Sequence, residues 1–342
     1  MFDSRTLFII GAGASAEVNL PIGDDLTKRI AKLLTFQFDG FQKTSGDELI
    51  YRALQQHISS TRRHDADQLL NSCLRISRAM PLASSIDSYL DSSPDDTNMI
   101  FCGKLGIARS ILDAERTSKL FFGANQASLD FRALSETWYN KIFKILCRGV
   151  SLKNIDYIFD NVSMIVFNYD RCIEHFIKNS LSTYFNLKPE RAEEITKTLH
   201  IIHPYGTVGE LPWKSKERSI SFGATPSPED LINISNKLYT FSESFEKITL
   251  KKIISDTVDE SDTVVFLGFG FHRQNMDLID KKSTREIKKI FGTLKGSSES
   301  DKLVVSQLVS ESFNINEPES KIHLRTDLTC NELFQEYSLS LG

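Results

Sequence analysis

Short apolar stretches and longer amphipathic stretches alternate along much of the chain. Six apolar stretches have the length and the residue types of β-strands. They are Thr6–Ile10, Ser163–Phe167, Leu199–His203, Thr263–Phe269, Ile287–Thr293 and Lys321–Leu324. Apolar residues at helical spacing mark five stretches between and after them: Asp170–Tyr184, Pro189–Thr198, Pro228–Asp256, Ser300–Glu311 and Leu328–Leu339. This alternation predicts an α/β fold with a doubly wound, mostly parallel six-stranded sheet.

Residues 27–154 follow a different pattern, in which apolar residues recur mainly at helical spacing. We expect helices over Glu48–Ile58 and Asp67–Met80, a helix capped at Ser85, one from about Ile107 to Phe121, and an amphipathic stripe over Leu134–Leu146. The pattern predicts a large helical insertion at residues 27–154 in a domain formed by residues 1–26 and 155–342. Apolar stripes of this kind are typical of a core or a subunit interface.

A glycine-rich turn follows the first predicted strand directly and leads into a predicted helix. It consists of Gly11, Ala12, Gly13, Ala14 and Ser15, and with Ala16 it has the pattern G-x-G-x-x-A. In Rossmann-like domains such a turn holds the pyrophosphate of a dinucleotide. A glycine turn that binds nothing is the alternative, and the acidic residue expected about 20 residues later for the ribose is missing.

Polar or glycine residues also end three later strands, where a parallel sheet binds its ligands. They are Asn168 and Asp170, then His203, and then Gly268, Phe269 and Gly270. Each group has a structural alternative: an Asx turn with a helix cap, a packed histidine, and a glycine turn. Together they predict a site at one edge of the sheet.

Composition narrows the class of protein. Hydrophobic residues make up 40% and charged residues 25% of the chain, and 23 phenylalanines provide ample core material, which excludes general disorder. The net charge of −4 argues against a protein that holds nucleic acid mainly by its phosphates. Five scattered cysteines without a C-x-x-C pair favour buried free thiols. We expect a cytoplasmic protein, because no signal peptide or membrane span is evident.

The four strand-end segments together resemble the motifs of the sirtuin (SIR2-like) family. Gly11–Ser15 matches its G-A-G-x-S loop, and Val166–Asp170 is similar to its T-Q-N-x-D segment, with Val-Phe in place of Thr-Gln. His203–Gly206 resembles a lengthened His-Gly motif, and Gly268–Gly270 is similar to the glycine-serine segment beside the adenosine of NAD. The motifs occur in the family order.

The resemblance implies a role for each of these residues. The loop Gly11–Ser15 would hold the pyrophosphate, and Asn168 would hold the nicotinamide ribose and position a water. Asp170 would receive the nicotinamide amide, and His203 would be the general base. Gly268, Phe269, Gly270 and Asn275 would line the adenosine side. A histidine suits proton transfer near neutral pH.

Departures from the sirtuin pattern indicate which branch of the family the chain resembles. Deacylating sirtuins carry a zinc ribbon built from two C-x-x-C pairs, which this chain lacks, and 35 residues separate Asn168 from His203. These features, with the helical segment Cys102–Arg116, resemble the bacterial SIR2-like NAD hydrolases of antiphage defence. The resemblance implies NAD as substrate and no metal. Because an NAD hydrolase that is always active is toxic, we expect its control by a homo-oligomer built through the insertion and by a separately encoded partner, a HerA-type ATPase being one candidate class. A protein deacylase or ADP-ribosyltransferase, and a non-catalytic module that binds NAD or ADP-ribose, are the alternatives.

Overall fold

The computed structural model describes residues 2–40, 42–61, 66–123, 126, 128–215, 218–283 and 285–341. Its main sheet has six parallel strands in the spatial order β5-β4-β1-β6-β7-β8. Their bounds are β1 Thr6–Ile10, β4 Val162–Val166, β5 His200–Ile202, β6 Thr263–Leu267, β7 Lys289–Thr293 and β8 Ile322–Arg325. This is the Rossmann strand order. From β1 the chain first adds β4 and β5 on one side and then returns to add β6, β7 and β8 on the other side, so that the order reverses between β1 and β6. The predicted α/β fold is confirmed, and every predicted strand lies within two residues of its observed bounds.

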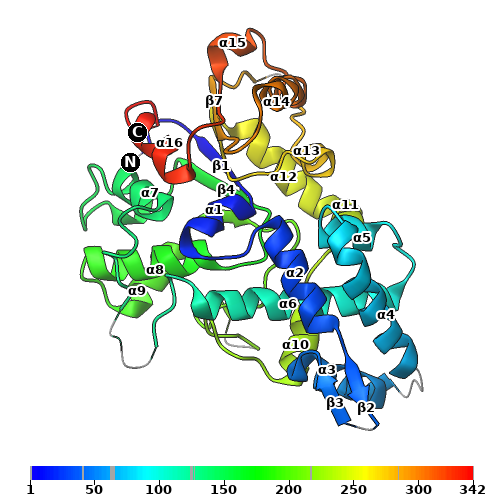
Figure 1. Ribbon diagram of the computed structural model, residues 1–342. Helices are drawn as coiled ribbons and strands as arrows, with labels where there is room; N and C mark the ends of the chain where they lie inside the picture. Colours follow the sequence, from blue (N-terminus) through cyan, green and yellow to red (C-terminus); the bar gives the residue numbers. More distant parts are fainter. Residues whose placement is uncertain are drawn as a thin grey trace.

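The strands are apolar on both faces because helices cover both faces. Along β1, Leu7 and Ile9 face one core, whereas Phe8 and Ile10 face the other. The first core also receives α12 (Ile248–Glu260), α13 (Arg273–Leu278) and α14 (Glu299–Ser312). The second receives α7 (Trp138–Leu146), α8 (Cys172–Tyr184), α9 (Pro189–Thr196) and α16 (Cys330–Glu336) (Figure 1).

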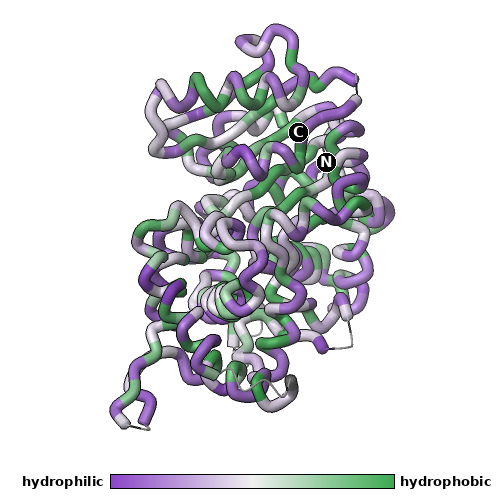
Figure 2. The backbone as a smooth tube through the Cα atoms, turned by 90° about the vertical axis from the view of Figure 1, so that its right-hand side faces the viewer, coloured by the Kyte–Doolittle hydropathy of each residue, from purple (hydrophilic) through white to green (hydrophobic). Residues whose placement is uncertain are grey.

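A separate group of helices packs around α6 (Thr97–Thr117), and we call it the helical bundle. Its other members are α2 (Gly23–Leu34), α3 (Glu48–Thr61), α4 (Ala66–Ala79), α5 (Ile86–Asp91) and α10 (Pro228–Ser235). In Figure 2 the tube alternates between hydrophilic and hydrophobic colours along its helical turns, as expected for helices that bury one face. The predicted insertion does not map onto this bundle alone, because α7 packs against α8 and α16 in the second core of the sheet and α10 comes from a later part of the chain. The division at residues 27 and 154 stays a prediction.

Several elements differ from the sequence expectation. The stretch expected as one helical segment over Pro228–Asp256 contains three helices, because Thr240 caps α11 (Phe241–Phe245) between α10 and α12. The helix expected to reach Phe121 ends at Thr117, where Ser118 is extended. A hairpin of β2 (Gln37–Asp39) and β3 (Gln42–Ser45) was not predicted, because its strands are polar and largely exposed.

The remaining elements are short. They are α1 (Ala12–Ser15), α15 (Pro318–Lys321), and the 3₁₀ turns Ala16–Val18, Met80–Leu82 and Ile155–Tyr157. All five cysteines are buried free thiols, as the sequence predicts. Within the described part of the chain, no helix combines the length and the apolar character that crossing a membrane requires.

Candidate functional site

A cavity of about 370 Å³ lies at the carboxyl ends of β1, β4 and β6. The boundary between β1 and β6 is where the chain reverses direction in the sheet, and ligands of open α/β sheets bind in the crevice at such a point. The loops after the three strands form one side of the cavity. Residues from α2, α5 and α11 face them from outside the sheet. The volume is within the range of small-molecule sites.

All but two of the predicted site residues line this cavity. Those that do are Gly11, Ala12, Gly13, Ser15, Asn168, Asp170, Gly268, Phe269, Gly270 and Asn275. The two exceptions are His203 and Ala14, a residue of the glycine turn that is fully buried. The structure therefore brings together residues from three strand ends, while the roles that the resemblance assigns to them stay predictions.

The glycines are required because two backbone turns touch. The N–H of Gly13 donates to the carbonyl oxygen of Gly268 at 3.0 Å. A Cβ on Gly11 would lie 2.6 Å from that oxygen, and a Cβ on Gly268, whose φ is +53°, would lie 2.1 Å from the nitrogen of Ala14. The resemblance assigns the whole turn Gly11–Ser15, Gly13 included, to a pyrophosphate. In the structure, the close approach at this position is that of the turn after β6.

Trp138 contacts the glycine turn, and Glu17, which follows the turn in the sequence, binds the starts of two helices. The indole Nε1 of Trp138 donates to the carbonyl oxygen of Ala14 at 2.8 Å. The carboxylate of Glu17 accepts from the backbone N–H groups of Trp138 at 2.7 Å and Asn331 at 2.8 Å, so that it caps the starts of α7 and α16. Burial raises the pKa of Glu17 despite these hydrogen bonds. The sequence analysis missed Glu17, because its partners lie more than 100 residues away.

Asn168 connects the end of β4 to the glycine turn. Its Nδ2 donates to the carbonyl oxygen of Gly11 at 3.1 Å and to Ser15 Oγ at 2.9 Å. Ser15 Oγ in turn donates to Asp170 Oδ2 at 2.9 Å. The other carboxylate oxygen of Asp170 accepts the N–H of Cys172 at 3.1 Å, at the start of α8. Asp170 thus closes an Asx turn, as the structural alternative proposed, and also lines the cavity.

His203 faces away from the cavity and into a buried polar cluster. Its Nε2 lies 3.2 Å from Glu174 Oε1, and its Nδ1 lies 3.3 Å from the backbone oxygen of Asn168. Lys214 donates to the same Glu174 oxygen at 2.8 Å. Burial alone would raise the pKa of Glu174, but His203 and Lys214 outweigh it and hold that pKa well below its usual range.

Both ring nitrogens of His203 therefore meet oxygen acceptors of the protein. A general base needs an unprotonated nitrogen within reach of the reacting water. The base role of His203 stays a prediction, and it requires the ring to release one of its two contacts. In the observed arrangement His203 positions the Asn168 backbone.

Two tyrosines at the cavity, Tyr169 and Tyr205, were not predicted as site residues. The hydroxyl of Tyr169 donates to Asp87 Oδ1, and that of Tyr205 donates to Asn275 Oδ1 at 2.5 Å. Asp87 lies on α5 of the helical bundle, 82 residues before Tyr169. The sequence analysis identified its neighbour Ser85 as a helix cap, and Ser85 does accept the N–H of Ser88 at 3.0 Å. No spacing rule connects this cap to the sheet edge.

A comparison with known families matches one part of the chain. Residues 162–315 match the family model of the SIR2-like domain. The match begins at β4 and contains Asn168, Asp170, His203 and the β6 turn, and it supports a relationship of the chain to the SIR2-like family. That family includes NAD-dependent enzymes, so the match supports an NAD-related activity in general terms. No curated protein matches the chain.

The SIR2-like region and the segments outside it build the cavity jointly. The glycine turn after β1 and the α5 residues Ser85 and Asp87 precede the matched residues, yet they line the same cavity as Asn168. The site is thus assembled from three separate parts of the chain.

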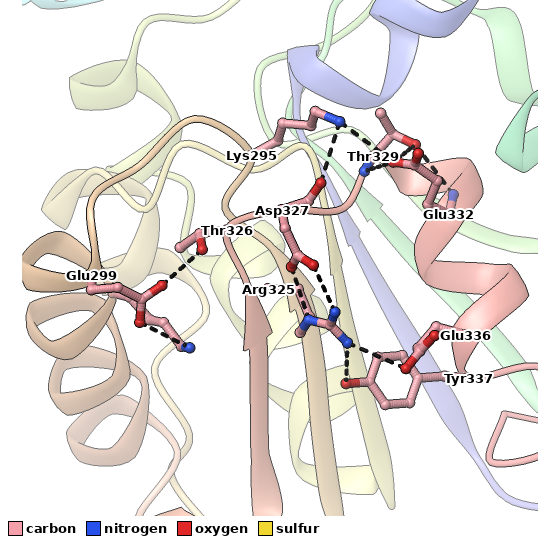
Figure 3. Close-up of polar contacts among 10 residues, drawn as sticks. Lys295, Glu299, Arg325, Thr326, Asp327, Thr329, Glu332, Glu336 and Tyr337 are labelled. Carbon is pink, nitrogen blue, oxygen red and sulfur yellow. Dashed lines mark hydrogen bonds and ion pairs between the residues drawn. The ribbon is translucent and has the colours of Figure 1, made fainter.

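Beyond β7 and β8, the same edge of the sheet carries charged side chains that contact one another (Figure 3). Arg325 donates to both carboxylate oxygens of Asp327 at 2.9 and 2.8 Å. Lys295 lies 3.4 Å from Glu332, and Glu332 caps α16 through Thr329. The charged groups drawn there are paired with one another.

Proposed function

We propose that this chain is an NAD+ hydrolase that releases nicotinamide and ADP-ribose. The observation that carries the proposal is Asn168, which lines the cavity at the end of β4 and is hydrogen-bonded to the glycine turn. It lies in the matched SIR2-like segment, and the site occupies the crevice where Rossmann-like domains bind dinucleotides.

The chemistry of the cavity fits cleavage of the N-glycosidic bond. As that bond breaks, positive charge develops on the ribose, and the site must orient the ribose hydroxyls and a water. Asn168 would hold the ribose and the water, and Asp170 would receive the nicotinamide amide. Gly268, Phe269, Gly270 and Asn275 would line the adenosine side, as the resemblance implies.

Hydrolysis rather than deacylation is favoured by what borders the cavity. The sequence has no C-x-x-C pair for the zinc ribbon of deacylating members. Residues of α5 and α11, among them Asp87 and Phe241, border the cavity instead. In this proposal, water takes the place of an acyl-lysine peptide.

An enzyme that destroys NAD+ needs control, and we extend the proposal to its setting. The chain acts as the toxic effector of a bacterial antiphage defence system. It forms a homo-oligomer and is released or activated by a separately encoded partner, for which a HerA-type ATPase is one class to test.

The test is product analysis after incubation of the purified chain with NAD+, alone and with candidate partners. We expect nicotinamide and ADP-ribose in equal amounts from the wild type, and loss of both with Asn168→Ala. Asn236→Ala, an exposed position at the end of α10, is the matched control and should retain activity. O-acetyl-ADP-ribose from an acetyl-lysine peptide would favour a deacylase instead. Tight NAD+ binding without any turnover would favour a binding module.

A further inference from the structure

Five titratable side chains line the cavity, and they differ in their hydrogen-bond partners and in their position. They are Asp87, Tyr169, Asp170, Tyr205 and His272. Both carboxylate oxygens of Asp170 accept hydrogen bonds from the protein. Burial raises the pKa of both tyrosines, so their hydroxyls stay protonated and act as donors. His272 lies at the exposed rim, with its ring against Gly270 on the β6 side. Asp87 is the remaining carboxylate.

Asp87 is held in place from two directions. It lies in the first turn of α5, whose start is fixed by the Ser85 cap. Its Oδ1 accepts the hydroxyl of Tyr169, the residue between Asn168 and Asp170. The Asp87 carboxylate on the helical bundle is therefore hydrogen-bonded to the segment after β4 that also carries Asn168.

We infer that Asp87 is the catalytic base of the proposed NAD+ hydrolysis, the group that accepts the proton of the attacking water. This inference rests on the proposed function. In the step, the bond between ribose C1′ and the nicotinamide nitrogen breaks, and its electron pair neutralises the pyridinium ring. The water oxygen bonds to C1′, one water proton passes to the Asp87 carboxylate, and that proton later leaves to solvent. Nicotinamide and ADP-ribose are the products, and no other reactant is consumed.

The surroundings of Asp87 make its carboxylate a better proton acceptor than an exposed aspartate. Burial raises its pKa, the neighbouring Asp91 carboxylate raises it further, and the Tyr169 hydrogen bond and the His272 ring lower it, with a net rise. The hydroxyl of Tyr205 is the other titratable group that faces it. A carboxylate with a raised pKa is a stronger base than an exposed one.

His203 is the competing base, and its geometry is less favourable. Its ring does not line the cavity and its two nitrogens are engaged with Glu174 and the Asn168 backbone. Asp87 lines the cavity without any rearrangement.

The test is the pH profile of NAD+ hydrolysis by Asp87→Asn in the full-length chain, with NAD+ binding measured by calorimetry. We expect kcat to fall at least about 100-fold, the Kd for NAD+ to change less than about threefold, and the acidic limb of the wild-type profile to disappear. Asp87→Glu should recover part of the activity. Asp95→Asn, an exposed carboxylate on the neighbouring loop, is the control and should match the wild type.

Folding of the variant is checked by its melting temperature. Because a raised pKa means that the ionised Asp87 opposes folding, Asp87→Asn should melt at or above the wild-type temperature at pH 7. An active wild type with an equally active Asp87→Asn overturns this inference alone. So does an Asp87→Asn variant that folds but no longer binds NAD+. A wild type that leaves NAD+ intact with every candidate partner overturns the proposed function as well.

Discussion

The two halves of the carboxyl edge of the sheet carry similar residues but differ in architecture. At β4, β1 and β6, polar and glycine residues surround a cavity of about 370 Å³. At β7 and β8, Arg325, Asp327, Lys295 and Glu332 are hydrogen-bonded to one another (Figure 3). Polar strand ends alone therefore do not make a site. The cavity exists where the chain reverses direction in the sheet and where α5 and α11 face that edge.

The two halves also differ in how their charges are held. Arg171, which follows the cavity residue Asp170, is buried and forms a two-pronged ion pair with the fully buried Glu115 of α6. The guanidinium also donates to the carbonyl oxygen of Ile220 at 2.6 Å. Arg325 at the β8 end is partly exposed, and its partner Asp327 is exposed. Substitutions at the two ends should therefore have unequal effects.

The largest effect is expected from Gly268→Ala. The new Cβ would collide with the backbone of the glycine turn at a left-handed φ, so both turns must separate. We expect a loss of about 3 kcal/mol or more in the free energy of unfolding, together with loss of NAD+ turnover. Chemical denaturation and a turnover assay measure the two quantities. Gly296→Ala, at a positive φ in open space after β7, is the matched control and should cost less. Equal losses in the two variants would contradict the proposed contact between the turns.

Glu115→Gln should cost a similar amount of stability, but it ranks second in combined effect because its side chain does not line the cavity. It leaves the buried Arg171 guanidinium without its countercharge, which typically costs about 3 to 5 kcal/mol. Urea denaturation followed by circular dichroism measures the loss. A change below 1 kcal/mol would show that this pair does not hold the bundle to the β4 end.

His203→Ala separates a base from a positioning residue. It removes one of the two side chains that contact the buried carboxylate of Glu174, and we expect a loss of about 2 kcal/mol in the free energy of unfolding at pH 7. Because the pKa of Glu174 is lowered in the fold, its contribution is present above its ordinary value of 4.5 and is lost as the pH falls below that value. The wild type should therefore lose more stability on acidification than the variant. Thermal melts between pH 3 and pH 7 measure this difference. If the residual NAD+ turnover of the variant falls at low pH as that of the wild type does, His203 is a positioning residue. If this fall at low pH is lost, His203 is the base.

The smallest effect is expected from Arg325→Ala at the β8 end. Exposed ion pairs contribute about 1 kcal/mol or less, and the residue does not line the cavity. NAD+ turnover should stay within twofold of the wild type, as measured under saturating NAD+. A large loss of turnover would mean that the site extends to this end of the edge.

The parts of the fold that follow local rules could be predicted from the sequence. The β-strands are continuous apolar runs, and the turns after β1 and β6 require glycine, so Gly11 and Gly268 were found as residues of one edge. The contacts of Glu17, Asp87 and Glu115 could not be found in this way, because each of them joins segments more than 50 residues apart. The orientation of His203 depends on Glu174 and Lys214, and no motif spacing encodes that orientation.

The most direct test of the central claim compares the two ends in one assay. NAD+ consumption and nicotinamide release are followed over time for the wild type, Asn168→Ala and Arg325→Ala, each with the activating partner present where one is required. We expect equal amounts of nicotinamide and ADP-ribose from the wild type and Arg325→Ala, and a rate at least about 100-fold lower from a folded Asn168→Ala. Undiminished nicotinamide release by Asn168→Ala would contradict the proposed role of this end of the sheet edge.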